Sequence, residues 1–423
     1  MTTITLRRSR LIDAANTIGG VLRRARVTVG RLEVSPILDI ARRRTGLEDF
    51  GDDAFLEPLE ILLDSYRNEA QLSFIGQIVA QQSTIALLAD RLRLVEDRKR
   101  NPEIAREHID RPVFIVGLPR TGTTLLHTLL SQDPANRIPL TWELMHPSPP
   151  PARSTYETDA RIARAQRQTK WLERLAPRFR AIHPVHARQP QECVSILSYS
   201  LLSSQFQTMF WIPTFEAWLE DQDLSTGYRW HRQILQHLQC RCPADRWVLK
   251  APMHLFALDN LIAEYPDARI IQTHRDPLMV LGSVASLSEA LQSAFSDSTD
   301  PLAIGTEVAD RWLEGANRSV RFRAGLGKPA SNILDVYFQD LQTDPMAVIR
   351  GLYSHFDMEL SSQAETRMNS FLASNPRHAR GRHVYDLADF GINPHEQHNR
   401  FATYREYFGV KPELALTPAV CAP

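Results

Sequence analysis

A short loop between an apolar strand and an apolar helix carries the residue types that bind phosphate. The run Val113-Phe114-Ile115-Val116 leads into a loop that contains Gly117 and Gly122, and an apolar stretch begins at Thr123. A glycine turn of this kind directs backbone N–H groups and the positive end of the helix dipole towards one point. The segment from Val113 to Leu130 therefore predicts an anion site, in preference to a tight turn that binds nothing.

The side chains of this loop separate it from the loop of nucleoside triphosphatases. Those enzymes place Gly-Lys-Ser/Thr here, with the lysine on the terminal phosphates and the hydroxyl on magnesium. This chain has Gly122-Thr123-Thr124, so the lysine is missing, and Arg120 supplies a cation from two positions before the glycine. Thr123 and Thr124 add hydroxyl donors for phosphate oxygens. No metal is expected, because the four cysteines form no paired CxxC with zinc-ligand spacing.

Alternating strand and helix patterns place this loop in a sheet. Further strand patterns at 247–250, 268–273 and 332–338 are each followed by an expected helix, the first of them running roughly from His254 to Glu264. Two helices are expected to start at Asp-Pro pairs, Asp276-Pro277 and Asp344-Pro345, because aspartate suits the N-cap and proline the first helical position. The predicted fold is therefore α/β, with a central parallel sheet flanked by helices.

Apolar residues at helical spacing over residues 52–98 predict a helical N-terminal region that ends near Asn101-Pro102. The expected domain division is a helical extension over residues 1–110 and an α/β domain over residues 111–423. A mostly helical insertion, at about residues 150–240, is expected within the α/β domain.

The loop resembles that of a known family. Leu118-Pro119-Arg120-Thr121-Gly122-Thr123-Thr124-Leu125-Leu126 is similar to the 5′-phosphosulfate loop of sulfotransferases that use 3′-phosphoadenosine-5′-phosphosulfate (PAPS). Its Pro-Arg-x-Gly-Thr-Thr pattern is closer to the bacterial and tyrosylprotein branch than to the cytosolic branch, which has Pro-Lys-x-Gly-Thr-Thr-Trp. The resemblance covers roughly residues 111–410 and implies a three-layer α/β/α fold like that of P-loop nucleoside triphosphatases. It assigns PAPS binding to Arg120, Thr121, Gly122, Thr123 and Thr124.

The resemblance also implies a second anion site for the 3′-phosphate of PAPS. The family uses an arginine and a serine eight positions later, and this chain has Arg275 at a strand end and Ser283 in the next helix. Arginine suits phosphate because its planar fork donates two parallel hydrogen bonds. The alternative is an ion pair of Arg275 with Asp276 or another local carboxylate. Arg380 and Arg382 are expected to clamp the nucleotide, unless they form a solvated charge run.

Sulfuryl transfer needs positive charge near the leaving phosphate and a base for the acceptor proton. Arg120 is expected to stabilise that charge, and Lys250, followed by Ala251-Pro252, resembles the lysine of the family's Lys-x-Pro pattern. Glu143 is the first candidate for the base, by resemblance to the tyrosylprotein branch, although it lies two residues further along than that branch places it. His254 is the rival, with a packed or helix-capping histidine as the alternative reading.

The acceptor is expected to be a lipophilic or aromatic small molecule. The segment from Cys193 to Phe215 carries no charge and is read as a buried helix that lines a pocket, because its serines and Pro213 do not suit a transmembrane helix. Together with Phe210, Trp211 and Trp218, it predicts a hydrophobic cavity. The competing reading is that these aromatic side chains belong to the core.

Overall charge limits the class of partner. The 49 basic and 49 acidic side chains of the 423-residue chain balance, which argues against nucleic acid as a partner. Residues 1–44 nevertheless hold ten arginines, so they form either a peripheral contact with an anionic membrane or a solvated helical extension. An arginine-rich start without an apolar region is not typical of a signal peptide, and a cytoplasmic protein is expected. Assembly as a homo-oligomer is left open.

Three functions are compatible with these features. The first is a PAPS-dependent sulfotransferase that moves a sulfuryl group to a hydroxyl or amine. The second is a phosphotransferase or nucleotide hydrolase with an unusual phosphate loop, against which the missing lysine speaks. The third is a non-catalytic scaffold that binds nucleotide or lipid. The two anion motifs favour the first.

Overall fold

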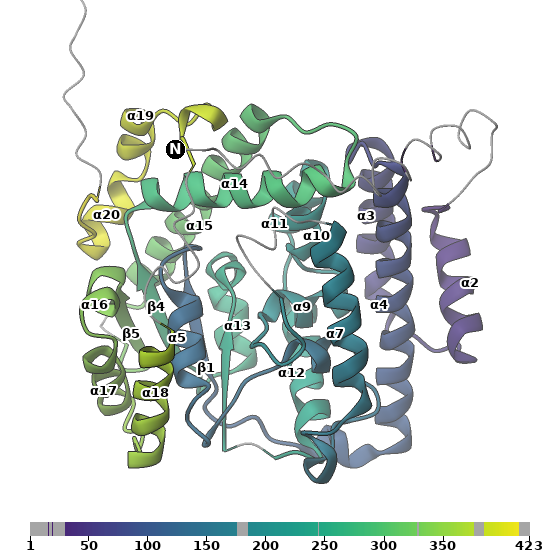
Figure 1. The fold of residues 1–423 in the computed structure, drawn as a ribbon, viewed down its shortest axis with the longest axis horizontal. Coiled ribbons are helices and arrows are strands. Elements are labelled where there is room, and N and C mark those ends of the chain that lie inside the picture. Colours follow the sequence, from purple (N-terminus) through teal and green to yellow (C-terminus); the bar gives the residue numbers. More distant parts are fainter. Residues whose placement is uncertain are drawn as a thin grey trace, which may run out of the picture. The chain divides into compact units, whose positions relative to one another are not determined.

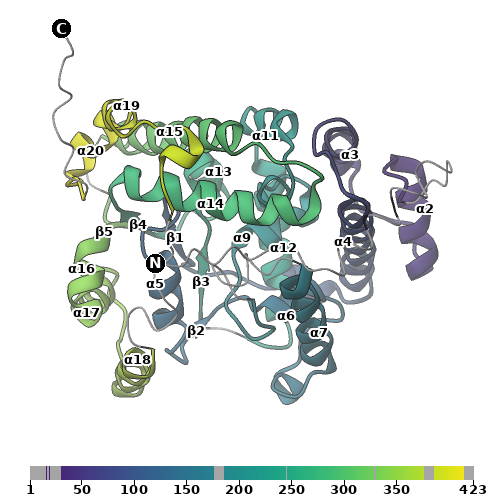
Figure 2. The same ribbon diagram turned by 45° about the horizontal axis from the view of Figure 1, so that its top comes forward.

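The computed structural model describes residues 16, 19, 30–175, 185–243, 245–327, 330–375 and 385–413 (Figures 1 and 2). The chain divides into two units. An α/β unit is formed by Asp110–Ile138, Ala244–Ser286 and Asp300–Pro423, and a helical unit by Met1–Ile109, Pro139–Pro243 and Leu287–Thr299.

Five strands form the sheet of the α/β unit, and every pairing between them is parallel. Their spatial order is β2-β3-β1-β4-β5. In this register Ile115 lies opposite both Lys250 and Ile271, so the strand that leads into the glycine loop is central. The strands are β1 (Val113–Gly117), β2 (Asn136–Arg137), β3 (Arg246–Lys250), β4 (Arg269–His274) and β5 (Ile333–Tyr337). The parallel sheet predicted from the sequence is confirmed.

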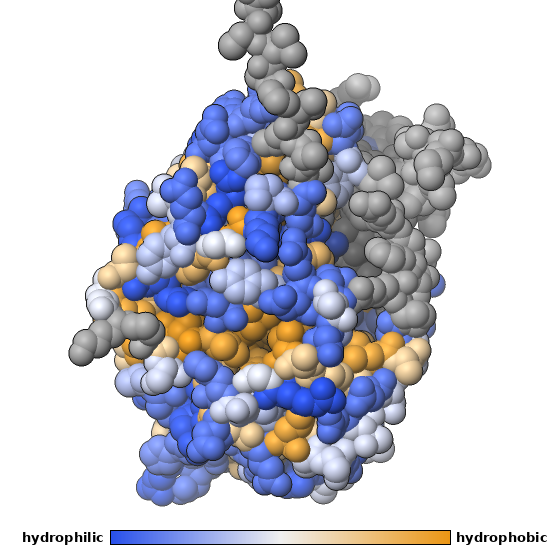
Figure 3. Space-filling model, turned by 90° about the vertical axis from the view of Figure 1, so that its left-hand side faces the viewer, coloured by the Kyte–Doolittle hydropathy of each residue, from blue (hydrophilic) through white to orange (hydrophobic). Residues whose placement is uncertain are grey.

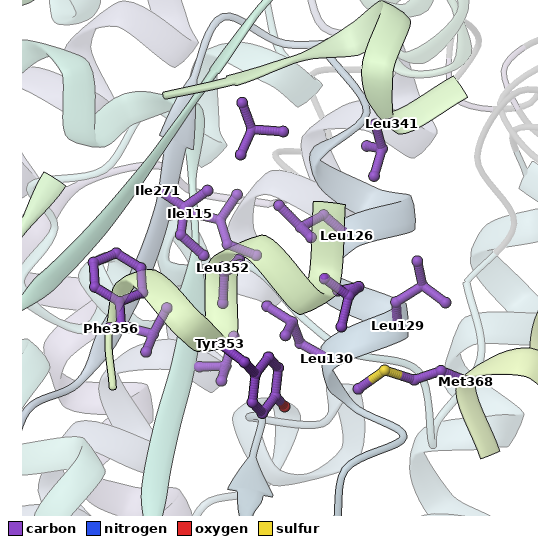
Figure 4. Packing of buried hydrophobic residues seen from close by; sticks show 14 of the residues in the cluster. Ile115, Leu126, Leu129, Leu130, Ile271, Leu341, Leu352, Tyr353, Phe356 and Met368 are labelled. Carbon is purple, nitrogen blue, oxygen red and sulfur yellow. The ribbon is translucent and has the colours of Figure 1, made fainter. Parts of the chain in front are cut away.

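One face of the sheet is covered by α5 (Thr123–Leu130), α17 (Pro345–His355) and α18 (Ser362–Ser374). Figure 4 shows Ile115 and Ile271 of the strands facing Leu126 of α5 and Leu352 of α17. All four side chains are fully buried. Burial of a side chain of this size stabilises the fold by about 1.5–3 kcal/mol, so this layer fixes α5, and with it the loop, against the sheet.

The opposite face is covered by the short helix η5 (Pro252–Phe256), α13 (Leu258–Glu264) and α15 (Pro301–Gly325). Phe114 points to this face because neighbouring residues of a strand alternate, and its ring lies 5.2 Å from the rings of His254 and Tyr265. Figure 2 shows the strands between α5 on one side and α13 and α15 on the other. The three-layer arrangement is therefore confirmed.

The two Asp-Pro helix starts are confirmed. Helix α14 (Pro277–Phe295) begins where Leu278 donates its backbone N–H to Asp276 Oδ1 at 3.2 Å. Helix α17 begins where Ala347 donates to Asp344 Oδ1 at 2.9 Å. The remaining helices of the α/β unit are α16 (Phe338–Thr343), η6 (Ala388–Phe390), α19 (Pro394–Arg400) and α20 (Ala402–Phe408).

The helical unit contains the predicted N-terminal helices. The buried guanidinium of Arg91 holds three of its segments together by donating to the carbonyl oxygens of Phe50 and Tyr199 at 2.8 Å and of Asp52 at 3.1 Å. Burial lowers the pKa of Arg91 to about 10, which leaves it charged at neutral pH. In the described part of this unit the helices are α2 (Val34–Thr45), η1 (Asp53–Phe55), α3 (Leu56–Asn68), α4 (Phe74–Arg100), η2 (Pro102–Arg106), α6 (Thr141–Met145), η3 (Arg153–Thr155), α7 (Ala160–Leu175), α9 (Cys193–Leu197), η4 (Ser198–Ser200), α10 (Gln205–Met209), α11 (Pro213–Glu220) and α12 (Ser225–Gln239).

The prediction of one helix over 193–215 is wrong. The segment is broken into α9, η4 and α10, and α11 starts at Pro213. Leu201 adopts a left-handed conformation at φ 64°, which ends η4. Serine hydroxyls bind nearby carbonyls instead of facing solvent, as when Ser203 donates to Val194 O at 2.7 Å, and such bonds compete with a regular helix.

Buried aromatic side chains of this segment pack against other aromatic rings of the helical unit. Phe210 and Phe215 are buried, and the Phe210 ring lies 4.9 Å from Tyr66 and 5.6 Å from Phe295. Trp211 is half-buried. The buried rings therefore form part of the core of the helical unit.

The expected helix over 254–264 is also divided, into η5 and α13. Ala257 separates the two with φ −147° and ψ 42°, which lies outside the helical region. Among the described residues, α14 is long and apolar enough to cross a membrane, and 72% of its apolar window is buried inside the structure. Burial of that extent is typical of a core helix.

Candidate anion-binding site

The loop after β1 requires glycine at two positions. Gly117 has φ +136°, and a Cβ there would lie 2.4 Å from Thr273 Oγ1 of β4. Gly122 has φ +89°, and a Cβ there would lie 2.7 Å from Leu341 Cδ2. Residues with side chains rarely adopt such φ values. The two glycines therefore let the loop pass close to β4 and turn directly into α5.

Two hydroxyls stiffen the inside of the loop. The Thr121 hydroxyl donates to Leu118 O at 2.7 Å and lies 2.6 Å from the hydroxyl of Thr273. Thr273 in turn donates to Val116 O at 3.1 Å. The Thr121 side chain is thus buried in the loop, and its backbone is what it can offer to a ligand.

The first turn of α5 follows directly. Thr123 is buried, whereas Thr124 is exposed. The N–H groups of a first helical turn have no partner within the helix, and the helix dipole adds partial positive charge there. The geometry is therefore that of an anion site at the N-terminus of an eight-residue helix.

Arg120 and Ser283 lie in contact at this site. Arg120 has φ 63° in the loop, and its Nε donates to the Ser283 hydroxyl of α14 at 3.1 Å. The pKa of Arg120 is lowered by desolvation and by the neighbouring charge of Arg275. Two of the predicted nucleotide-binding residues thus meet across 163 positions of chain.

Arg275 follows β4 and reaches the same loop. Its Nη1 donates to Arg120 O at 3.0 Å, and its guanidinium stacks on the ring of Phe338 at 3.9 Å. An atom of that ring lies 3.3 Å from the place that a Cβ on Gly122 would take. Arg275 therefore lies beside the glycine loop, as a two-ended anion site requires.

Arg275 is also engaged by a carboxylate that the sequence did not indicate. Glu413 accepts from Arg275 Nε at 2.9 Å and from Nη2 at 3.0 Å. The sequence had offered Asp276 or another local partner for such a pair. Glu413 lies 138 positions away, and no local signal points to it.

Lys250 occupies the end of the strand on the other side of β1. It is buried, as few lysines are. The pKa of His127 is lowered to about 3, mainly because the His127 ring is buried and in addition because the charge of Lys250 is near. Because β1 lies between β3 and β4, Lys250 and Arg275 flank the glycine loop at the carboxyl edge of the sheet, where open α/β sheets bind ligands.

The two base candidates have different surroundings. His254 is fully buried with its ring edge-on to Phe114, and burial lowers its pKa to about 3. Glu143 lies in α6 of the helical unit and is buried, and its Oε2 accepts from the backbone N–H of Leu140 at 2.9 Å. Both assignments stay predictions.

Arg380 and Arg382 lie outside the described residues. Tyr385, which follows them, packs on α14: its hydroxyl donates to Met279 O at 3.0 Å, and its ring would lie 2.5 Å from a Cβ on Gly282. Gly282 is the neighbour of Ser283, so a glycine beside the predicted serine was the available signal for this contact. Within the described ranges no group of three or more His, Cys, Asp or Glu side chains gathers as a metal site.

Comparison with known proteins agrees with this geometry. The model of the sulfotransferase family matches residues 112–362, more than half of the chain. Omega-hydroxy-beta-dihydromenaquinone-9 sulfotransferase Stf3 of Mycobacterium bovis is 26% identical over 282 residues, 63% of this chain and 68% of that protein. The protein of the same name from Mycobacterium tuberculosis matches with the same figures.

Solved structures extend the similarity to most of the chain. Sulfotransferase STF1 from Mycobacterium tuberculosis is 33% identical with a TM-score of 0.78, covering 88% of this chain and 98% of that one. Sulfotransferase STF9 from Mycobacterium avium is 28% identical with a TM-score of 0.83, covering 91% and 99%.

Proposed function

The chain belongs to the sulfotransferase family, and we propose that it moves a sulfuryl group from PAPS to the hydroxyl group of a lipophilic acceptor. The observation that carries this proposal is the meeting of Arg120, Ser283 and Arg275 beside the glycine loop. PAPS carries a 5′-phosphosulfate and a 3′-phosphate, so it needs two anion sites on one sheet edge.

The residues fit the two ends of this donor. The N–H groups at the start of α5, with the hydroxyl of Thr124, suit the 5′-phosphosulfate. Arg275 and Ser283 suit the 3′-phosphate, since both supply hydrogen-bond donors. Arg120 belongs to the loop that leads into α5, and it contacts both Ser283 and Arg275, so it connects the two groups of residues.

The chemistry assigns a role to the two flanking cations. PAPS, when bound, supplies the sulfuryl group: the acceptor oxygen forms a bond to sulfur as the bond from sulfur to the 5′-phosphate oxygen breaks. The leaving phosphate gains negative charge in that step. We assign the stabilisation of this charge to Arg120 and Lys250, with the N-terminus of α5. Lys250 is buried and Arg120 is held by Ser283, and fixed cations need no reorganisation during the reaction.

The acceptor proton needs a base, and we assign it to Glu143, with His254 as the alternative. A carboxylate accepts the proton as the oxygen attacks, and a buried position protects the reaction from water. His254 with a pKa of about 3 is neutral at pH 7, and it binds a proton only weakly.

The acceptor class is inferred from the relatives. The printed name of Stf3 describes an omega-hydroxylated dihydromenaquinone as its acceptor. Figure 3 adds that apolar side chains are exposed in the middle of an otherwise mostly hydrophilic face. Both observations support a hydrophobic alcohol rather than a sugar or a basic peptide.

A thermal-shift measurement tests the donor. Adenosine 3′,5′-bisphosphate (PAP), the desulfated product, is expected to raise the melting temperature more than ATP with magnesium does, because only PAP has a 3′-phosphate for Arg275 and Ser283. Equal shifts, or none, would count against a PAPS site. Transfer of ³⁵S from PAPS to a panel of long-chain and aromatic alcohols then tests the acceptor class.

A further inference from the structure

Glu413 neutralises the arginine that the proposed function assigns to the 3′-phosphate. Both carboxylate oxygens accept from one edge of the Arg275 guanidinium, at 2.9 and 3.0 Å. A charge-assisted pair with two parallel hydrogen bonds is the geometry by which arginine also binds phosphate. Glu413 is four-fifths buried, so solvent screens this pair less than an ordinary surface pair.

The backbone of Glu413 is held by the residue next to Arg275. Its N–H donates to Asp276 Oδ2 at 2.7 Å, while the other oxygen of Asp276 accepts from Leu278 and caps α14. The adjacent residues Arg275 and Asp276 therefore bind the side chain and the main chain of the same glutamate.

The segment that delivers Glu413 is anchored to the sheet. Tyr337 of β5 donates its hydroxyl to Phe408 O at 2.8 Å, and the ring of Phe408 lies 4.4 Å from that of His274 at the end of β4. After α20, Val410 N donates to Arg405 O at 2.9 Å. Within the described part of this segment, these contacts leave the residues from Lys411 to Glu413 to move if the carboxylate leaves Arg275.

We propose that Glu413 is an internal anion that occupies Arg275 in the nucleotide-free protein and is exchanged for the 3′-phosphate when the donor binds. This inference rests on the proposed function. A phosphate with nearly two negative charges and a carboxylate repel each other when both contact one guanidinium. Arg275 has a single positive charge, so it cannot neutralise both.

The exchange couples the nucleotide to the C-terminal segment. Donor binding releases Glu413 from Arg275, and by reciprocity the return of Glu413 favours departure of the nucleotide. The product PAP carries the same 3′-phosphate as PAPS and therefore competes with Glu413 in the same way. Glu413 thus weakens the binding of PAP and favours its release. Arg275 therefore forms an ion pair throughout the reaction cycle, with the Glu413 carboxylate before the donor binds and after PAP leaves, and with the 3′-phosphate in between.

Calorimetric titration of full-length protein with PAP and with AMP tests this exchange. Glu413→Gln removes the charge and keeps the shape, and it is expected to bind PAP about five- to tenfold more tightly than the wild type, in line with the loss of a partly buried competing charge. AMP lacks the 3′-phosphate, so its affinity is expected to stay within about twofold. Glu406→Gln is the matched control, because this substitution removes the same charge from an exposed position on α20.

Three outcomes would overturn the exchange. If Glu413→Gln bound PAP no better than Glu406→Gln did, Glu413 would not compete with the phosphate. If PAP and AMP gained equally, the effect would be general electrostatics rather than exchange at Arg275. If PAP bound neither the wild type nor Glu413→Gln, the proposed donor site would fail along with the exchange, whereas the first two outcomes leave that site intact.

Hydrogen exchange tests the release of Glu413 without a measurement of binding constants. The amide of Glu413 donates to Asp276 Oδ2, so saturating PAP is expected to speed its exchange with solvent, and Glu413→Gln is expected to show faster exchange without nucleotide. Unchanged or greater protection of this amide with PAP bound would contradict release of the segment. Glu413→Ala, tested in parallel, guards against a glutamine that keeps the contact through its own amide oxygen.

Discussion

The guanidinium of Arg275 donates a hydrogen bond to the carbonyl oxygen of Arg120 at 3.0 Å, across 155 positions of chain. Arg120 belongs to the glycine loop after β1, and Arg275 follows the neighbouring strand β4. Since the carboxyl ends of parallel strands lie at the same edge of a sheet, the loop after β1 and the residue after β4 come together. The proposed donor, with its two anionic ends, depends on this contact.

Arg275→Ala is expected to weaken PAP binding by about tenfold or more, because a charge-assisted contact of arginine with phosphate is lost. Calorimetry with PAP and AMP measures the effect, and AMP should lose much less. Arg367→Ala is the control, since Arg367 is exposed on α18 of the same unit. An unchanged PAP affinity in Arg275→Ala would remove the 3′-phosphate assignment.

Arg120→Ala and Lys250→Met are expected to lower kcat by about 10²–10³, because each removes a fixed positive charge from the leaving phosphate. Lys250→Met keeps the buried volume of the side chain. Steady-state kinetics with PAPS should show a smaller change in KM than in kcat. A large rise in KM at constant kcat would mean that the residue only holds the donor.

Glu143→Gln and His254→Asn, compared in one transfer assay, separate the two base candidates. If Glu143 is the base, Glu143→Gln is expected to lose about 10²–10⁴ of kcat, and His254→Asn should keep most of it. Circular dichroism of both variants checks that the fold persists, because both side chains are buried. The reverse ranking would transfer the role to His254.

Gly122→Ala is expected to destabilise the α/β unit by about 1–3 kcal/mol, since a Cβ at φ +89° is strained and would lie 2.7 Å from Leu341. Denaturant unfolding measures the loss. Gly351→Ala in α17 is the control: nothing lies within 4 Å of its Cβ position, so it should stabilise the protein by about 1 kcal/mol. Equal effects at both glycines would contradict the strained loop.

Acid is expected to destabilise the fold through buried histidines. Burial lowers the pKa of His127 and His254 to about 3 and that of His237 to about 4. The unfolded chain binds protons at these histidines from about pH 6.5 downwards, whereas the folded chain does not. Stability should therefore be constant above about pH 6.5 and fall below it, by up to about 1.4 kcal/mol per pH unit for each histidine.

Melting temperatures between pH 8 and pH 4.5 measure this dependence. His127→Gln keeps a hydrogen-bonding side chain beside Val248 O. It should remove the part of the pH dependence of the free energy of unfolding that His127 contributes, up to about 1.4 kcal/mol per pH unit. If His127→Gln lost stability in acid as steeply as the wild type does, His127 would titrate in the folded protein as it does in the unfolded chain.

Local patterns determined much of the α/β unit from the sequence alone. The apolar runs of β1, β3, β4 and β5 and the caps at Asp276 and Asp344 are visible there because strand pattern and capping depend on neighbouring residues. The spacing of Gly117 and Gly122 likewise marked the loop. The resemblance then added Arg275 and Ser283, whose roles no local rule could give.

Long-range packing decided the rest. Spatial strand order put Lys250 and Arg275 on either side of the loop, and the path of the C-terminal segment brought Glu413 to Arg275. The uncharged segment over 193–215 breaks into short helices because its serines bind nearby carbonyls, a choice that hydrophobicity does not reveal. Sequence patterns report what neighbours along the chain prefer, whereas burial and the pairing of charges depend on groups that only the folded chain brings together.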